Sequence, residues 1–335
     1  MELAIRLEIS NNAGLDGESA ETVPKIISYG AGRNPQAYII ILEKLSVKTC
    51  LDIDPMGEEY VDGENKQKMY DEYVDKYNKI KSLKKSPMQE VCLQELDTSI
   101  KAMTRLTIGV LTELQCQENK TLQDKVLFQK EGDEFLTLDK LNTYNTTMIP
   151  LQWHIAFDGR YLGKLSEKVV KIRNRSKGFT GWCSTPAYRP LVLVSQKNFK
   201  DPEKWKPFTP KRTVIGTLFP LLQKQVTTTP YTKADIKLLK SYASSTKKKL
   251  IQVTFDIEGQ KCNGTKEAIC EHYWFYVSDE TTKYIGMNLE LIDAGDYDND
   301  GTSEVLFWHS SYNEDGYKLF YNNFKKSVKL YWGYN

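Results

Sequence analysis

The sequence predicts an α+β protein, mainly antiparallel β, with a helical hairpin in its N-terminal region and a C-terminal β-meander. Apolar residues recur at helical spacing between about residues 66 and 106, whereas beyond residue 110 they alternate with period two. Turn residues separate the short apolar runs that follow residue 250. We therefore expect a mixed region over residues 1–110 and a β-rich domain over residues 111–335, with the α-hairpin at about 66–106 and the meander at about 250–335.

Residues 1–60 are expected to form short strands and loops, with apolar runs at residues 26–30 and 36–45. The stretch GAGRNP, from Gly30 to Pro35, matches the first half of a glycine-rich dinucleotide pattern. Asn34 and Pro35 interrupt that pattern and no helical periodicity opens there, so we interpret the stretch as a turn.

Two apolar stripes predict the helical hairpin. The first recurs at spacings of four, four and three residues, at Met69, Tyr73, Tyr77 and Ile80. In the second helix Ser86 can cap, Pro87 suits the first position, and Gln89 can reach back to complete a capping box. Its stripe follows at Met88, Cys92, Leu96, Ile100 and Met103. We interpret both stripes as core packing.

The middle of the chain is predicted to be mostly strands. Alternating apolar residues over 149–157 lead into Asp158-Gly159, which is typical of a hairpin turn. Further strands are expected at 189–196, 212–222 and 251–257, the last one half-buried, with a surface loop over 198–211. Thr232 and Asp235 open an expected helix at 232–243.

The meander is predicted from five apolar runs, at 272–277, 284–292, 304–310, 317–323 and 328–334. Aromatic residues concentrate there, and we expect them to bury sheet faces rather than to form a stacking platform for sugars or bases. These residues are Trp274, Phe275, Phe307, Trp308, Phe320, Tyr331 and Trp332.

Composition excludes some function classes. The chain has 46 Lys and Arg residues against 44 Asp and Glu residues, so its net charge is close to zero. Lys supplies 38 of the 46 basic residues, and Arg, which binds phosphates and bases best, is scarce. Nucleic-acid binding is therefore not expected. No run is long enough for a transmembrane segment, and the opening residues lack a secretory pattern. The protein is then either cytosolic or begins after a removed leader.

The 6 cysteines form no CxxC pair, which argues against a zinc ribbon or a thioredoxin-type motif. They allow either a set of disulfides or free buried thiols. Cys262 and Cys270 bracket a short loop between two strand-like segments, and a hairpin there would bring them together, so we expect that disulfide.

The acidic stretch DAGDYDNDGTSEVLFW, residues 293–308, predicts a metal site. Counted from Asp296, carboxylates fall at positions one, three, five and nine, Gly301 is sixth, and the carbonyl of Thr302 is seventh. Close carboxylates repel one another unless a cation lies between them. Oxygen ligands without His or Cys favour Ca²⁺ over the more strictly octahedral Mg²⁺. An EF-hand is excluded because position twelve is Phe307 and both flanks alternate as strands.

Over about 15 residues, AGDYDNDGTSEVLF resembles the DxDxDGxxD/E calcium loop of FG-GAP and VCBS-type repeats, which lies between two meander strands in secreted and cell-surface proteins. The resemblance implies that the calcium ligands are Asp296, Asp298, Asp300, Thr302 and Glu304. A single copy without an FG or GAP signature argues against a propeller of such repeats. Residues 153–165 and 189–207 also look like the middle region of secreted bacterial proteins that carry such a loop, a resemblance that implies no particular activity.

Other candidate sites are weaker. The three histidines, His154, His272 and His309, lie far apart beside aromatic residues, and we interpret them as structural. The acidic residues between 51 and 64 fit no ligand spacing and indicate a solvated loop. No serine-nucleophile elbow or zinc-protease HExxH pair occurs, so the catalytic residues are unknown.

Two functions fit these observations. The first is a secreted or cell-envelope binding protein, extracellular or periplasmic, whose structural Ca²⁺ stabilises a β-rich fold and whose partner is a protein or a glycan. The alternative is an extracellular hydrolase with a cleft between its two regions. A calcium site with the millimolar affinity of extracellular modules would fill outside the cytoplasm and stay largely empty inside it, which favours placement outside.

Overall fold

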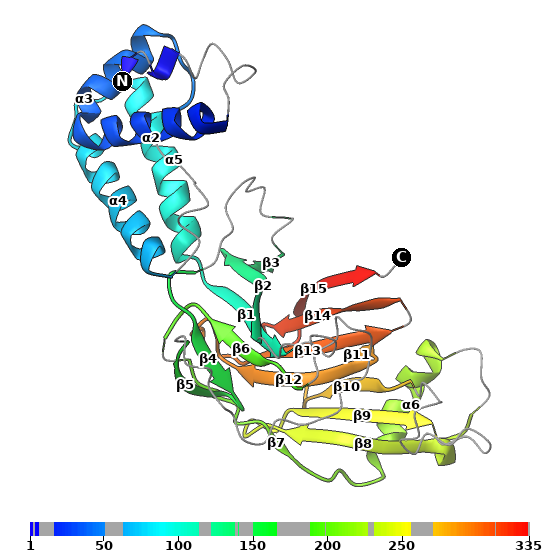
Figure 1. Ribbon diagram of the computed structural model, residues 1–335. Coiled ribbons are helices and arrows are strands. Elements are labelled where there is room, and N and C mark those ends of the chain that lie inside the picture. The colour runs from blue at the N-terminus through cyan, green and yellow to red at the C-terminus, as the bar shows by residue number, and fades with distance from the viewer. Residues whose placement is uncertain are drawn as a thin grey trace. The chain divides into compact units, whose positions relative to one another are not determined.

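The computed structural model describes residues 1–2, 4–6, 17–50, 63–113, 122–137, 140, 150–165, 188–197, 199–226, 231–255, 271–311 and 313–333. The chain divides into two compact units, whose elements are labelled in Figure 1. The helical unit comprises Met1–Arg105 with Asn142–Gln152, and the β-rich unit comprises Leu106–Leu141 with Trp153–Asn335. The predicted α+β class with mainly antiparallel sheet is confirmed.

The helical unit is built from four labelled helices around one core. They are α2 (Gly17–Arg33), α3 (Pro35–Lys44), α4 (Gly63–Lys81) and α5 (Pro87–Thr104). Ile27, Tyr38, Ile80 and Leu96 are all buried in a single apolar cluster. A disulfide between Cys50 and Cys92 joins the segment after α3 to α5, and it spans 42 residues of sequence.

The α4–α5 hairpin confirms the predicted helical stripes. Ser86 caps α5 as expected, since its side chain accepts a hydrogen bond from the backbone N–H of Gln89 at 3.2 Å. Gln89 does not reach back to the cap. Its side-chain amide donates instead to the carbonyl oxygens of Ile80, at 2.8 Å, and Leu83, at 3.1 Å, and so satisfies the end of α4.

The prediction of strands and loops over residues 1–60 is wrong for the apolar runs at 26–30 and 36–45, which lie in α2 and α3. The supposed turn at Gly30–Pro35 is the end of α2 followed directly by the start of α3. Asn34 caps α3 by accepting from Ala37 N at 3.1 Å, and Pro35 occupies its first turn. Tyr38, Ile39 and Leu42 are buried on one side of α3, a helical pattern that the continuous apolar run concealed.

In the β-rich unit, the first sheet is antiparallel with the strand order β3-β2-β1-β6-β4-β5. Its strands are β1 (Thr107–Glu113), β2 (Leu122–Glu131), β3 (Glu134–Leu136), β4 (His154–Phe157), β5 (Arg160–Lys164) and β6 (Leu191–Val194). The predicted hairpin at Asp158-Gly159 is confirmed, because φ is 53° and 64° at these residues, as a tight turn between β4 and β5 requires. The predicted strand within 189–196 is β6.

The second sheet has the order β11-β10-β9-β8-β7 and carries helix α6 (Val214–Gln225). Its strands are β7 (Lys206–Pro207), β8 (Ile236–Ala243), β9 (Lys249–Phe255), β10 (Tyr273–Val277) and β11 (Thr282–Met287). Leu218 and Leu222 of α6 pack into one cluster with Ile251 and Phe275 of the sheet. Strand β9 is buried on both faces rather than half-buried, since Gln252 and Thr254 are also buried.

Two predicted elements in this sheet are wrong. Residues 212–222 are expected to form a strand, yet residues 214–222 lie in α6, whose buried residues Ile215, Leu218 and Leu222 have helical spacing. Residues 232–243 are expected to form a helix. Thr232 and Asp235 do form a capping box, but it caps only the 3₁₀ turn Lys233–Asp235, and the rest is strand β8. Pairing of β8 with β9 outweighs the helix-start signal.

The third sheet is the meander β12-β13-β14-β15, drawn orange to red in Figure 1. Its strands are β12 (Leu289–Gly295), β13 (Glu304–Ser311), β14 (Glu314–Tyr321) and β15 (Lys326–Gly333). Leu306 and Trp308 belong to the cluster that includes the first sheet, whereas Val305 and Phe307 belong to the cluster that includes the second. Because successive strand residues face opposite sides, the meander lies between two cores.

This two-sided burial explains the aromatic content of the carboxyl end. Trp274, Phe307 and Trp308 are all almost completely buried. Trp274 packs edge-on against Phe307 at 5.4 Å between ring centroids, and Trp308 packs likewise against Tyr317 at 4.9 Å. These rings therefore fill sheet faces, as the sequence predicts.

Candidate metal centre

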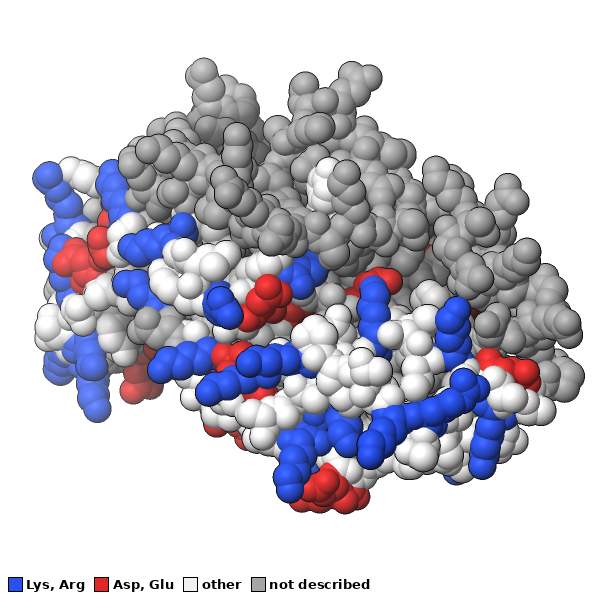
Figure 2. Space-filling model, turned by 90° about the horizontal axis from the view of Figure 1, so that it is seen from below, with Lys and Arg blue, Asp and Glu red and all other residues white. Residues whose placement is uncertain are grey.

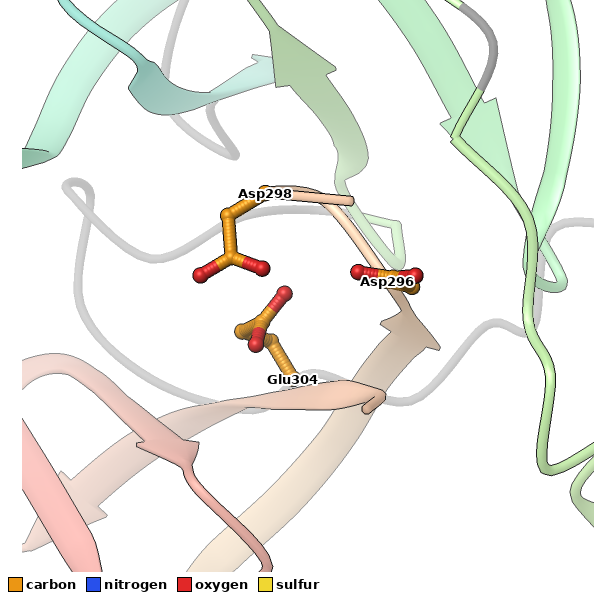
Figure 3. Close-up of side chains that lie close together, drawn as sticks. All are labelled: Asp296, Asp298 and Glu304. Atoms are coloured by element: carbon orange, nitrogen blue, oxygen red, sulfur yellow. The ribbon is translucent and has the colours of Figure 1, made fainter. Parts of the chain in front are cut away.

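The acidic loop connects β12 to β13 at the point where their pairing ends, with Gly295 opposite Glu304. Figure 3 shows Asp296 and Asp298 on the loop and Glu304 at the start of β13, with the carboxylates of Asp298 and Glu304 pointing toward one another. One carboxylate oxygen from each of these three residues lies within 4.8 Å of the others. The loop thus gathers three acidic groups that could hold a metal ion.

Backbone N–H groups fold the loop around Asp296. Its carboxylate accepts from Asp300 N at 2.9 Å and from Gly301 N at 3.0 Å. Gly301 has φ of 89°, a conformation that favours glycine, and Asn299 also lies in the left-handed region with φ of 59°. These turns give the local geometry that the spacing of aspartates and glycine predicts.

Glu304 is the most unusual residue of the loop, because its carboxylate is 0% exposed. Its Oε2 accepts from Tyr297 N at 2.8 Å, whereas Oε1 is buried without a hydrogen-bond partner among the described residues. Burial, reinforced by the Asp298 charge, raises the pKa of Glu304 to about 9. An oxygen in this position needs either a proton or a cation.

Lys130, on β2, brings one positive charge to the loop. Its ammonium forms an ion pair with Asp298 Oδ2, and the Asp298 side chain is only 3% exposed. The two residues are 168 positions apart in sequence, so no local pattern could have pointed to Lys130. Asp296, Asp298 and Glu304 carry three negative charges when ionised, and Lys130 reduces the total to minus two.

The loop is also fixed from outside by residues 200–201. Asp296 N donates to Lys200 O at 2.6 Å, and Ser303 Oγ donates to Asp201 Oδ1 at 2.8 Å. Tyr297 is fully buried between these contacts and packs edge-on against Phe199 at 5.8 Å. The carboxylates are therefore held by a packed scaffold, and the surface loop expected at 198–211 has buried anchors.

Of the five predicted calcium ligands, Asp296, Asp298 and Glu304 lie together. Asp300 is exposed, and its Oδ1 accepts from Thr302 N at 2.7 Å. Both flanks of the loop are strands and Phe307 is buried in the core, so the exclusion of an EF-hand agrees with the structure. The assignment of all five as calcium ligands stays a prediction.

The other candidate residues occupy different surroundings. His154 Nδ1 lies 3.4 Å from the Tyr161 hydroxyl, and His309 Nε2 lies 3.1 Å from Glu314 Oε1. Burial lowers the pKa of both histidines. Most of the acidic stretch 51–64 lies outside the described residues, as do Cys262 and Cys270, so the expected disulfide between those two cysteines stays a prediction. Within the part of the chain that the structure describes, no second group of three metal-ligating side chains occurs.

The fold and the loop together define a mainly antiparallel α+β protein with a buried acidic cluster suited to a cation. No protein-family model, curated protein or solved structure matches the chain. Among the described helices, none is both long and apolar enough to cross a membrane.

Proposed function

We propose that the protein is a calcium-stabilised binding protein that works outside the cytoplasm, either secreted or at the cell envelope. The ion is structural and joins β12 to β13 through the acidic loop. The observation that carries this proposal is the buried Glu304, whose carboxylate lies near two further carboxylates and whose Oε1 has no hydrogen-bond partner among the described residues. Burying an uncompensated carboxylate is costly, and a cation among these oxygens would remove that cost.

The charge of the cluster favours a divalent ion. Three carboxylates and the Lys130 ammonium leave a formal charge of minus two, which a divalent ion would neutralise. All the gathered ligands are oxygen atoms, which suit Ca²⁺ and Mg²⁺ rather than softer metals. Three carboxylates fit the larger, more variable shell of Ca²⁺ better than the strict octahedron of Mg²⁺, which usually takes one or two carboxylates and several waters.

A structural role follows from where the loop lies. The two strands that it joins belong to the sheet that is buried on both faces, so fixing the loop fixes their register. The Cys50–Cys92 disulfide supports an oxidising compartment. Extracellular calcium modules bind with dissociation constants of about 0.1 to 1 mM, which matches the calcium concentration outside cells.

The ligand of such a protein is a protein or a glycan, and exposed lysines of the β-rich unit suit a ligand that carries acidic groups. Lys206 of β7 and Lys237 and Lys240 of β8 are exposed. Figure 2, which views the molecule from below, shows Lys and Arg side chains widely spread over that face, with acidic ones among them. Such a mixed surface favours a partner with scattered acidic groups over a nucleic-acid backbone.

Thermal unfolding in calcium, magnesium or chelator tests the proposal. At a calcium concentration tenfold above the dissociation constant, we expect about 1.4 kcal/mol of stabilisation. For a domain of the size of the β-rich unit, this stabilisation corresponds to a rise in Tm of about 3 to 6 °C. Magnesium should give a smaller rise at equal concentration.

Glu304→Gln provides the matched variant. The amide keeps the shape and can still accept from Tyr297 N, while its NH₂ group can donate to the aspartates but cannot bind a cation. We expect this variant to fold and to lose the calcium response, whereas Glu290→Gln, on the same sheet, should keep it. Equal Tm values for the natural protein in calcium and in chelator would refute the site.

A further inference from the structure

A second polar cluster in the β-rich unit joins two turns from different sheets. Lys248 lies in the turn between β8 and β9, and Asn323 lies in the turn between β14 and β15. The Lys248 ammonium contacts both Asn323 Oδ1 and Glu203 Oε1, and Glu203 lies just before β7. We propose that Lys248 and Asn323 are joined by a side-chain amide bond, formed within the folded protein with Glu203 as the proton carrier.

The reacting atoms lie in contact. Lys248 Nζ touches Asn323 Oδ1, which is bonded to the electrophilic carbon Cγ at about 1.2 Å. An amine held against an amide carbonyl gains the large rate advantage of an intramolecular reaction. The Lys248 ammonium has three donors, of which Glu203 takes one, and the contact with the Asn323 amide oxygen places Nζ beside the amide carbon that it would attack.

The site is partly closed to water. The Glu203 side chain is 6% exposed and the Lys248 side chain is 19% exposed. Phe324, next to Asn323, is buried and stacks on Tyr276 at 4.4 Å between ring centroids. Burial raises the pKa of Glu203, which favours transfer of a proton from the ammonium to the carboxylate and leaves a neutral, nucleophilic amine.

The backbone holds all three residues in position. Ser245 N donates to Glu203 O at 2.6 Å, and Lys248 N donates to Ser244 Oγ at 3.0 Å, so the β8–β9 turn is fixed against Glu203. Left-handed backbone conformations occur at or beside every member of the cluster, at Lys204, Lys247, Asn322, Asn323 and Phe324. Asn tolerates this conformation, but it is costly for Lys and Phe, and such positions often lie at functional sites.

The reaction balances without an oxidant or a cofactor. The Lys248 ammonium gives one proton to Glu203, and the resulting amine attacks Cγ of Asn323. A new bond forms from Cγ to Nζ while the bond from Cγ to Nδ2 breaks. Nδ2 takes a second lysine proton and leaves as ammonia, which recovers the first proton from Glu203 and departs as ammonium. The product is an amide that keeps one hydrogen on Nζ.

The bond would tie the second and third sheets together across 75 residues of sequence. It is independent of calcium, because neither Lys248 nor Asn323 belongs to the acidic loop. A covalent tie between sheets suits a protein that must withstand force or proteolysis outside the cell, but its existence does not depend on that role.

Intact-mass measurement of the natural protein is the test. We expect a mass lower than the sequence mass by one ammonia, in addition to any loss from disulfides, which reduction removes. After reduction and trypsin digestion, the peptides that contain Lys248 and Asn323 should be found as one linked species. A full sequence mass after reduction, with the two residues in separate peptides, would show an ordinary ion pair and overturn the proposal.

Variants then separate the roles. Lys248→Arg and Asn323→Ala should restore the full mass because they remove the nucleophile and the electrophile. Glu203→Gln keeps both reacting groups, and we expect it to be mostly unlinked. Lys249→Arg, at the first residue of β9 next to Lys248, is the matched control and should keep the ammonia deficit. If Glu203→Gln is fully linked, Glu203 is not the proton carrier.

Discussion

Asp293 on β12 provides a prediction that depends on burial rather than on the metal. Its carboxyl is buried, and its Oδ1 accepts from Gly159 N at 3.0 Å across the turn between β4 and β5. Burial raises the pKa of Asp293 from 3.8 to about 7, although the Gly159 hydrogen bond and the nearby Arg189 charge act in the opposite direction. We expect Asp293→Asn to be more stable than the natural protein above pH 7.

The magnitude follows from linkage. A carboxyl whose pKa is raised on folding stabilises the protein fully below pH 3.8, and this contribution is lost as the pH rises through 7. The difference between 3.8 and about 7, at about 1.4 kcal/mol for each tenfold change in proton affinity, gives about 4 kcal/mol. Asparagine is neutral at every pH and can still accept from Gly159 N, so the variant avoids this loss.

Urea unfolding at pH 4 to 8, followed by circular dichroism in saturating calcium, measures the effect. We expect the free energy of unfolding of Asp293→Asn, relative to the natural protein, to increase by about 4 kcal/mol between pH 4 and pH 8. Asp279→Asn, at an exposed turn between β10 and β11, is the control and should show no such trend. A constant difference across this pH range would mean that folding does not raise the pKa of Asp293, and the reasoning from burial would fail.

Three further predictions concern the loop, the sheets and the helical unit. Lys130→Met removes an ammonium group that competes with calcium for Asp298, so the calcium affinity should increase about fivefold. Titration calorimetry measures this affinity, and weaker binding by the variant would contradict the competition. Gly316→Ala would push a Cβ into the backbone carbonyl of the neighbouring strand and should lower the free energy of unfolding by about 1 to 3 kcal/mol. Gly216→Ala, on α6, places its Cβ in open space and should raise the free energy of unfolding by about 0.5 to 1 kcal/mol. Reduction of Cys50–Cys92, which closes a separation of 42 residues, should destabilise the helical unit by about 4 kcal/mol in chemical unfolding, and an unchanged midpoint would contradict this.

Local signals predicted several elements correctly. The Ser86 cap, the Asp158-Gly159 turn and the Thr232–Asp235 capping box all form, because each depends on residues within a few positions of one another. The acidic loop also depends on short-range contacts, because the Asp296 carboxylate accepts hydrogen bonds from the backbone N–H groups four and five residues later in the chain. Short-range hydrogen bonds of this kind can be read from spacing alone.

The wrong secondary-structure predictions fall in segments whose local sequence is compatible with either a helix or a strand. Residues 212–222 form a mainly apolar run that suits a strand, yet residues 214–222 lie in α6, and residues 236–243 follow a helix-start signal yet form β8. In both segments the outcome depends on a partner distant in sequence, since α6 packs on the sheet and β8 pairs with β9. Tertiary packing contributes more free energy than the small differences in propensity.

The sequence by itself determined the α+β class, the hairpin, the meander and the aspartate spacing of the loop. Only the tertiary structure decided that the meander lies between two cores, that Glu304 is buried with one unpaired oxygen, and that Lys130 faces Asp298. It alone brought Glu203, Lys248 and Asn323 together. The physical reason is distance along the chain. These contacts join residues that are 45 to 168 positions apart in sequence, and only the packing of the sheets brings them together.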